Sequence, residues 1–413
     1  MDPLVPIHCS GGRLPSDEQE VHARVLAGAD VDYPRSLKET LSDVRVDFQG
    51  LASWRRGSAR FPCRTCTRGQ PVPTTRVVDA SVPDQRREAR KDRGMDAGRA
   101  DDMTPSPFVR FSREEWGRLQ ASAPLSLSED DVRDLRRVAG HLSSEEATGV
   151  YLPLSWLLHL HVGAAQGLYR SAQAFLGKQA AEVPYVVGIA GSVAAGKSTV
   201  AEMVKALISL WPEKPKVELV STDGFLYPNQ VLRSRGLMDR KGFPESYDLP
   251  LLLRFLADLK AGRAELGAPI HSHLTYDILP DQAQRIRRPD VLIVEGLNML
   301  EAGLPEPSEG HRVFVSDYVD FSIYVDAEER YIKAWYLDRF LRLREEALGD
   351  DSAYFHRFAD LSVEEAKDSA LRVWDEIDHP NLKENIEPTR DRARLILEKG
   401  PDHSVRSVRL RRL

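Results

Sequence analysis

The stretch from Tyr185 to Val200 constrains the fold more than any other part of the chain. It reads YVVGIAGSVAAGKSTV, and its glycines, lysine and serine match the pattern G-x-x-x-x-G-K-[ST]. Residues 185–190 form an apolar run that is typical of a buried parallel strand. After the loop, apolar residues at i, i+3, i+4, i+7 and i+8 predict one face of a helix: Val200, Met203, Val204, Leu207 and Ile208. Pro212 ends the pattern, so we predict the order strand, glycine loop, helix.

Such a loop has the chemistry needed to hold a nucleoside triphosphate. Glycines let successive backbone N–H groups converge on phosphate oxygens at the positive end of the helix. Lys197 reaches the β- and γ-phosphates, and Ser198 can ligate Mg²⁺. The alternative is a glycine turn whose lysine is merely solvated. The residues assigned to nucleotide binding are Gly191, Ser192, Val193, Ala194, Ala195, Gly196, Lys197, Ser198 and Thr199.

Length and charge narrow the class of partner. The chain has 413 residues, enough for one large α/β domain or two smaller ones. Its net charge of -6 provides no chain-wide attraction to nucleic acid or to an anionic membrane, which favours a small-molecule or protein partner. The first residues lack the pattern of a secretory signal. The most apolar helical stretch, 151–162, falls far short of the roughly 20 residues that span a bilayer. We therefore expect a soluble, cytoplasmic protein.

Residues 1–104 differ in composition from the rest of the chain. They are rich in arginine, proline, glycine and serine, with few periodic apolar runs, and this composition predicts disorder. Met95 and Met103 stand just before the first well-patterned segment. One hypothesis is that the extension results from the choice of an upstream start codon. A native intact mass equal to that of the full chain would contradict it.

From residue 105 onward the pattern is that of an α/β domain. Ser112 and Glu115 form a predicted capping box, and Ser128 is placed to cap another helix. Strand-like runs then alternate with helical or loop segments, which predicts a mostly parallel sheet with helices on both faces. These runs span 217–221, 291–297, 321–327 and 393–400. We expect a P-loop NTPase-like domain over residues 105–413.

Two carboxylates follow strands at the edge where parallel sheets bind ligands. Asp223 follows VELVST and Glu295 follows VLIV, and ligands sit beyond the carboxyl ends of such strands. Phosphoryl transfer to an alcohol needs a carboxylate that accepts the hydroxyl proton and benefits from another near Mg²⁺. We assign Asp223 the role of base and Glu295 the metal shell; the alternative is that each merely ends a strand. Asp326 also ends a strand, but its surroundings favour a helix N-cap.

A helical segment at 329–348 could supply an arginine for the transferred phosphoryl group. Negative charge builds on that group during transfer, and an arginine commonly stabilises it. Tyr336 and Arg339 are three residues apart, on one helical face. An aromatic and arginine face suits a polar organic acceptor. The alternative is that the aromatic residues belong to the core and the arginine is solvated.

Two patterns suggest metal ligands but are incomplete. The three cysteines are Cys9, Cys63 and Cys66, and a single C-x-x-C lacks the second ligand pair of a structural zinc site. His271 and His273, in HSHLTYD, likewise lack an obvious third ligand. We therefore disfavour a metal at either place.

Several motifs, taken in order, resemble the bacterial type I pantothenate kinases from about Ser106 to Leu413. They are GSVAAGKST, STDGFLYPNQVLRSRGLMDRKGFPESYD, HSHLTYD, DVLIVEGLN, SDYVDFSIYVDA, WYLDRF and NLKENIEPTR. The resemblance implies a P-loop kinase that transfers phosphate from ATP to pantothenate, the first step towards coenzyme A. It also implies a homodimer, through the long helix after the phosphate-binding loop, and feedback inhibition by coenzyme A.

The resemblance also implies roles for individual residues. Lys197 and Ser198 would serve ATP and Mg²⁺. Asp223 would accept the hydroxyl proton, and Arg339 would contact the transferred phosphoryl group. The residues implied to line the pantothenate pocket are His273, Tyr276, Tyr336 and Asp378.

Three positions depart from the family pattern. Asp378 stands where the family usually has an asparagine, and a carboxylate cannot donate an amide N–H and would repel an anionic substrate. Glu202 replaces an arginine that helps to bind coenzyme A phosphates, which puts the inhibition in doubt. Leu348 replaces a pocket phenylalanine and alters packing more than chemistry.

Other functions stay open at this point. A uridine kinase or phosphoribulokinase relative shares the phosphate-binding loop but should lack KGFPESYD and WYLDRF. A regulatory switch that binds GTP is disfavoured because no N-K-x-D motif is present. A diverged relative that binds ATP without transferring phosphate is the remaining alternative.

Overall fold

The computed structural model describes residues 106–122, 143–178, 183–301 and 313–412, together with 128, 130, 131, 133, 135 and 137. The chain divides into a unit that ends at Gly98 and a second that runs from Arg99 to Leu413. All described residues belong to the second unit. The predicted disorder of residues 1–104 and the three cysteines lie outside the described residues.

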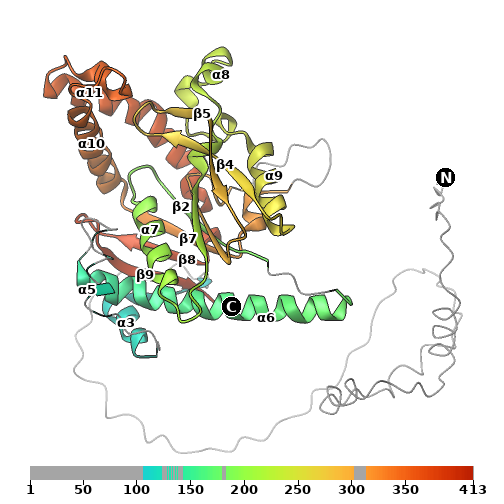
Figure 1. Cartoon of the computed structure of the whole chain (residues 1–413). Helices are drawn as coiled ribbons and strands as arrows, with labels where there is room; N and C mark the ends of the chain where they lie inside the picture. The colour runs from blue at the N-terminus through green and yellow to red at the C-terminus, as the bar shows by residue number, and fades with distance from the viewer. Residues whose placement is uncertain are drawn as a thin grey trace, which may run out of the picture. The chain divides into compact units, whose positions relative to one another are not determined.

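One mixed sheet organises the described part of the chain (Figure 1). Its seven strands run in the order β1-β9-β8-β7-β2-β6-β3. The strands from β8 to β3 are parallel to their neighbours, whereas β9 and β1 add to the β8 edge in antiparallel fashion. Their bounds are β1 Phe108–Ser112, β2 Tyr185–Gly191, β3 Val217–Ser221, β6 Val291–Glu295, β7 Phe321–Ala327, β8 Leu395–Lys399 and β9 Val405–Arg411. The predicted mostly parallel sheet is confirmed.

A separate antiparallel pair, β4 (Leu266–Ser272) and β5 (Asp277–Ile286), was not expected from the sequence. The helix after the loop and the helix predicted at 329–348 are present as α7 and α10, and the capping box of Ser112 and Glu115 is present. Ser128 also accepts a hydrogen bond from the Asp131 amide. The helix bounds are α3 Arg113–Arg118, α5 Ser144–Glu146, α6 Leu152–Phe175, α7 Lys197–Ser209, α8 Asn229–Ser234, α9 Leu249–Lys260, α10 Glu329–Glu346, α11 Val363–Val373 and α12 His379–Asn381.

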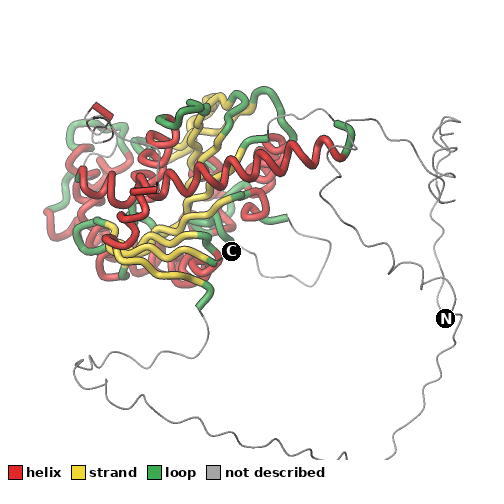
Figure 2. The backbone as a smooth tube through the Cα atoms, turned by 90° about the horizontal axis from the view of Figure 1, so that it is seen from below, coloured by secondary structure: helices red, strands yellow, loops and turns green. Residues whose placement is uncertain are grey.

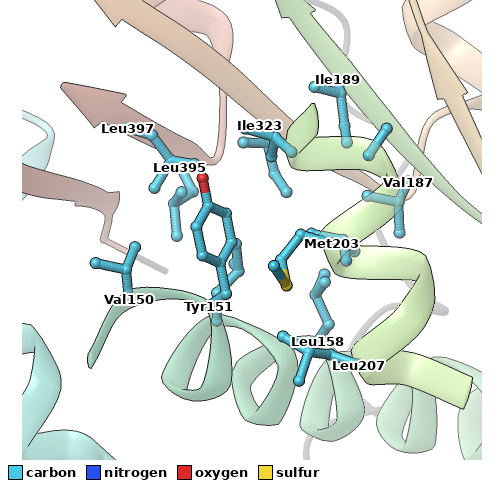
Figure 3. Close-up of a cluster of buried hydrophobic side chains, with 14 of the residues drawn as sticks. Val150, Tyr151, Leu158, Val187, Ile189, Met203, Leu207, Ile323, Leu395 and Leu397 are labelled. Carbon is cyan, nitrogen blue, oxygen red and sulfur yellow. The ribbon is translucent and has the colours of Figure 1, made fainter. Parts of the chain in front are cut away.

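Two cores hold β2 in place because its side chains alternate between the faces of the sheet. Val187 and Ile189 join the core under α6 and α7, where Leu158 and Met203 also lie (Figure 3). Val186 and Ala190 join the opposite core. That second core is closed by apolar side chains of α9 and α10 and by Trp374, Leu382 and Ile386. Helices therefore cover both faces, as predicted.

The expected N-cap role of Asp326 is wrong. Asp326 belongs to β7, which continues to Ala327, and Glu328 is the residue that precedes α10. The side chain of Asp326 is instead paired with Arg390, at 3.5 Å between Oδ2 and Nη1. The strand simply runs further than its polar ending suggested.

The long helix lies before the phosphate-binding loop rather than after it. The helix after the loop, α7, has 13 residues and buries its apolar face, whereas α6 has 24 residues. One end of α6 extends past the strands in both views (Figures 1 and 2). None of the helices in the described residues is long and apolar enough to cross a membrane.

Candidate active site

The phosphate-binding loop, residues 191–199, connects the end of β2 to the start of α7. Gly191 has a φ of 144°, and a Cβ there would lie 2.5 Å from the Val325 carbonyl oxygen of the adjacent strand. Gly196 has a φ of 87° and precedes α7 without a side-chain cap. The first amides of α7 are therefore left without a capping side chain, which is the condition for binding an anion at a helix N-terminus.

The lysine and serine of the loop have protein partners in this structure. The half-buried Lys197 donates from Nζ to the Ser192 carbonyl oxygen at 3.0 Å. The exposed Ser198 donates from Oγ to Glu295 Oε1 at 3.3 Å. The hydroxyl and the carboxylate predicted to serve a metal ion are thus adjacent.

Strand register brings the two predicted carboxylates together. Ser221 of β3 pairs with Glu295 of β6, and Asp223 follows two residues later. Burial raises the pKa of Glu295, while Lys197 opposes the shift and the Asp223 charge adds to it. The structure thus places Asp223 and Glu295 at one edge of the sheet, whereas their chemical roles remain predictions.

The ammonium group of Lys197 interacts with charges at this edge of the sheet and with a charge on α10. Burial lowers the pKa of Lys197, and the charges of Glu295 and Asp223 raise it. Arg339 and Asp378 act on the same ammonium group, the first lowering its pKa and the second raising it. Lys197 therefore shares one electrostatic environment with predicted residues from four other segments.

Two pairs of aromatic side chains lie near these charged groups. Tyr276 lies between β4 and β5, and its ring is 4.6 Å from that of Tyr354. Burial raises the pKa of Tyr276, and the charges of Asp378 and Asp223 raise it further. Tyr336 of α10 contacts Trp374, with ring centroids 5.5 Å apart. The predicted pocket tyrosines are thus near the carboxylates.

Asp378 ends a π-helical turn, Trp374–Asp378, a widened geometry that is frequent at functional sites. Tyr336 is its hydrogen-bond partner. Burial raises the pKa of Asp378 to about 7, although Tyr336, Arg339 and Lys197 all act to lower it. Near neutral pH, a large fraction of this carboxyl group is therefore protonated and able to donate a hydrogen bond, as the amide of an asparagine does.

The two histidines differ in their surroundings. His273 is exposed, and its ring lies 5.6 Å from that of His271. Both ring nitrogens of His271 are buried without a hydrogen-bond partner, and burial lowers its pKa to about 4. The described residues contain no group of three or more histidine, cysteine, aspartate or glutamate side chains that could hold a metal ion.

Sequence reasoning missed Lys241 and Tyr354. Lys241 Nζ lies 4.0 Å from the centroid of the Tyr276 ring and donates to the Tyr276 carbonyl oxygen at 2.6 Å. The KGFPESYD motif that contains Lys241 was a signal, but no local pattern shows that it lies next to HSHLTYD. Tyr354 carries no sequence signal at all.

Similarity to known proteins shows the family to which this chain belongs. Residues 186–347 match the Phosphoribulokinase / Uridine kinase family. A pantothenate kinase from Myxococcus xanthus is 55% identical over 311 residues, covering 75% of this chain and 98% of that relative. The chain belongs to the pantothenate kinase family. A member from Parvibaculum lavamentivorans is 51% identical, covering 77% and 98% of the two chains; one from Brevibacillus brevis is 53% identical, covering 75% and 97%.

We expect Asp223→Asn to leave ATP affinity within about twofold of the original. Turnover should fall by roughly 10²- to 10⁴-fold, because the substitution removes only the proton acceptor. Titration calorimetry with ATP and steady-state kinetics measure the two quantities. Asp368→Asn, at an exposed position of α11, is the matched control and should change neither. An equal loss of binding and turnover would contradict the assigned role.

Proposed function

We propose that this chain phosphorylates pantothenate with ATP in the cytoplasm and forms 4′-phosphopantothenate. The observation that carries the proposal is geometric: strand register brings the segment of Asp223 beside Glu295, and Ser198 of the phosphate-binding loop donates a hydrogen bond to Glu295. Family membership supplies the substrate class. The chain matches nearly the whole length of relatives named pantothenate kinase.

The proposed reaction is an in-line transfer. The acceptor hydroxyl gives its proton to the Asp223 carboxylate as its oxygen bonds to the γ-phosphorus. The bond from the γ-phosphorus to the β,γ-bridging oxygen breaks, and ADP leaves. Lys197 and the loop amides hold the phosphates, while Arg339 stabilises charge on the migrating group.

The residues present fit a magnesium ion. Mg²⁺ prefers oxygen ligands, keeps several waters and is usually bound through one or two carboxylates plus substrate phosphates. Ser198 Oγ and Glu295 Oε1, 3.3 Å apart, provide such oxygens beside the loop. Ser198 would hold the ion directly and Glu295 would hold it or its waters. When bound, it neutralises phosphate charge.

The pocket proposed for pantothenate is formed by Tyr276, Tyr336, Asp378 and the exposed His273. Tyrosines present apolar faces and hydroxyl groups to a small polar acid. Coenzyme A is proposed as a feedback inhibitor, but Glu202, half-buried on α7, places a carboxylate where phosphates would bind. Weak inhibition is the expected consequence.

A coupled assay of ADP release tests the proposed function. We expect release that depends on pantothenate, with uridine and ribulose 5-phosphate as the competing acceptors. Uridine or ribulose 5-phosphate as the preferred acceptor would favour the wider family that matches residues 186–347. ATP binding without transfer to any acceptor would identify a non-catalytic relative. Addition of coenzyme A to the same assay measures its inhibition.

The pKa of Asp378 predicts a pH-dependent affinity for pantothenate. The carboxyl group is neutral below about pH 7 and negative above it, so it repels the anionic substrate only at the higher pH. The KM for pantothenate should rise about five- to tenfold, ~1 to 1.4 kcal/mol, as pH increases from 6 to 8. Asp378→Asn should flatten this profile. A profile that is unchanged in the variant would assign the titration to another group.

We also propose a homodimer in which α6 of one copy packs against α6 of another. Exposed apolar or small residues follow one face of this helix at spacings of three or four: Leu160, Ala164, Leu168, Ala172 and Phe175. Leu168 is 74% exposed and Phe175 is 88% exposed, which is unusual for large apolar side chains in register. In a dimer with a two-fold axis, this stripe on each copy would be buried against the same stripe on the other copy.

Light scattering coupled to size-exclusion chromatography tests this interface. The unaltered protein should have the mass of a dimer, and Leu168→Glu should have that of a monomer, because the dimer would bury an unpaired charge. Leu274→Glu, at another exposed leucine, is the control and should remain dimeric. A dimer that survives Leu168→Glu would require a different interface.

A further inference from the structure

A buried lysine lies behind the phosphate-binding loop and has no part in the proposed chemistry. Lys399 is the last residue of β8 and is only 8% exposed. Its Nζ donates to the Ala195 carbonyl oxygen at 3.1 Å. A Cβ built on Gly196 would lie 2.6 Å from the same nitrogen. The ammonium group is therefore packed against the two residues that lead into α7.

This contact determines where one loop amide points. In a trans peptide, the carbonyl of one residue and the N–H of the next point in opposite directions. A carbonyl of Ala195 held against Lys399 therefore turns the amide of Gly196 away from the lysine. That amide belongs to the loop whose N–H groups converge on phosphate oxygens. The lysine acts on the anion site through the backbone, without facing the nucleotide.

A buried carboxylate supplies the counter-charge. Glu146 ends α5 and is 4% exposed. Its Oε1 accepts a hydrogen bond from the Val405 amide of β9 at 2.9 Å. Burial lowers the pKa of Lys399 to about 8, and the charge of Glu146 acts to raise it. A lone charge would be costly at this depth, and the charge of each residue favours ionisation of the other.

We propose that Lys399 is a positioning residue, which pins the Ala195 carbonyl and so aims the Gly196 amide at the nucleotide phosphates, with Glu146 as its counter-charge. The two residues connect the loop to β8, β9 and α5, elements that carry none of the residues assigned to the chemistry. The proposal rests on the proposed nucleotide-binding function of the loop. It adds a determinant of phosphate affinity that the loop motif does not contain.

The experiment compares ligands with and without phosphates. In Lys399→Met, the Kd of ADP by calorimetry should rise at least tenfold. The affinity of adenosine, measured by displacement of a fluorescent ADP analogue, should stay within twofold, since adenosine has no phosphate for the loop to hold. If Lys399 had a purely structural role, the substitution would weaken the binding of both ligands or of neither.

Lys260→Met is the matched control. Lys260 also donates to a backbone carbonyl, that of Pro184 at 2.9 Å, but at the opposite end of β2 from the loop. Its loss should lower the melting temperature and leave the Kd of ADP unchanged. Glu146→Gln keeps the acceptor for Val405 and removes the charge, so it should weaken ADP binding less than Lys399→Met does.

The outcomes separate this inference from the proposed function. An Lys399→Met protein that is folded and binds ADP within twofold of the original overturns the inference, as does an equal loss of adenosine affinity. If Lys399→Met does not fold, Glu146→Gln decides, and an unchanged Kd of ADP in that variant overturns the inference. If the unaltered protein does not bind ADP, or does not phosphorylate pantothenate, that result contradicts the proposed function and not the inference about Lys399.

Discussion

The uncapped amides at the start of α7 are the constraint on which the rest of the structure depends. A helix whose first N–H groups lack side-chain partners is stabilised when an anion binds there. For those groups to meet a ligand, β2 must end at the helix start, and both elements must be held rigidly. The cores on either face of β2 do this, since alternate residues such as Val186 and Val187 pack in opposite directions. The anion site thus derives from the packing of the central strand.

Parallel strand order then concentrates the charges. Because β3, β6 and β2 are neighbours, the residues that follow them share one edge, and Asp223, Glu295 and Lys197 lie together. Burial opposes ionisation of Glu295 and of Lys197, and the opposite charges of these two groups partly compensate for it. The site therefore tolerates buried charges because they come from adjacent strand ends. The charges of Arg339 on α10 and Asp378 on the π-helical turn act on the same lysine.

The sequence predicted the central strands and the loop well because their signals are local. Apolar runs, turn glycines and helix periodicity located β2, β3, β6 and β7 to within two residues. It did not predict β4 and β5, whose polar residues and bends hide a strand pattern. It missed Lys399 for a different reason: a lysine at the end of an apolar strand looks solvated until β9 and α5 cover it. Asp326 was misread because the end of a strand and the cap of a helix share the same polar residues.

The segments that form the proposed pantothenate pocket are joined by the same kind of contact, a hydrogen bond from a side-chain donor to a backbone carbonyl oxygen. The Gly242 carbonyl accepts from the amides of Asn298 and Asn381, at 3.2 and 2.9 Å, so the segment that bears Asp378 is fixed to the loop after Lys241. The Tyr276 carbonyl accepts from Lys241 and from Asn229 at 3.0 Å, although Tyr276 has a left-handed φ of 51°. Such bonds constrain loops that have no ladder of their own. Loops held by the protein's own hydrogen bonds lose less conformational entropy when a ligand binds.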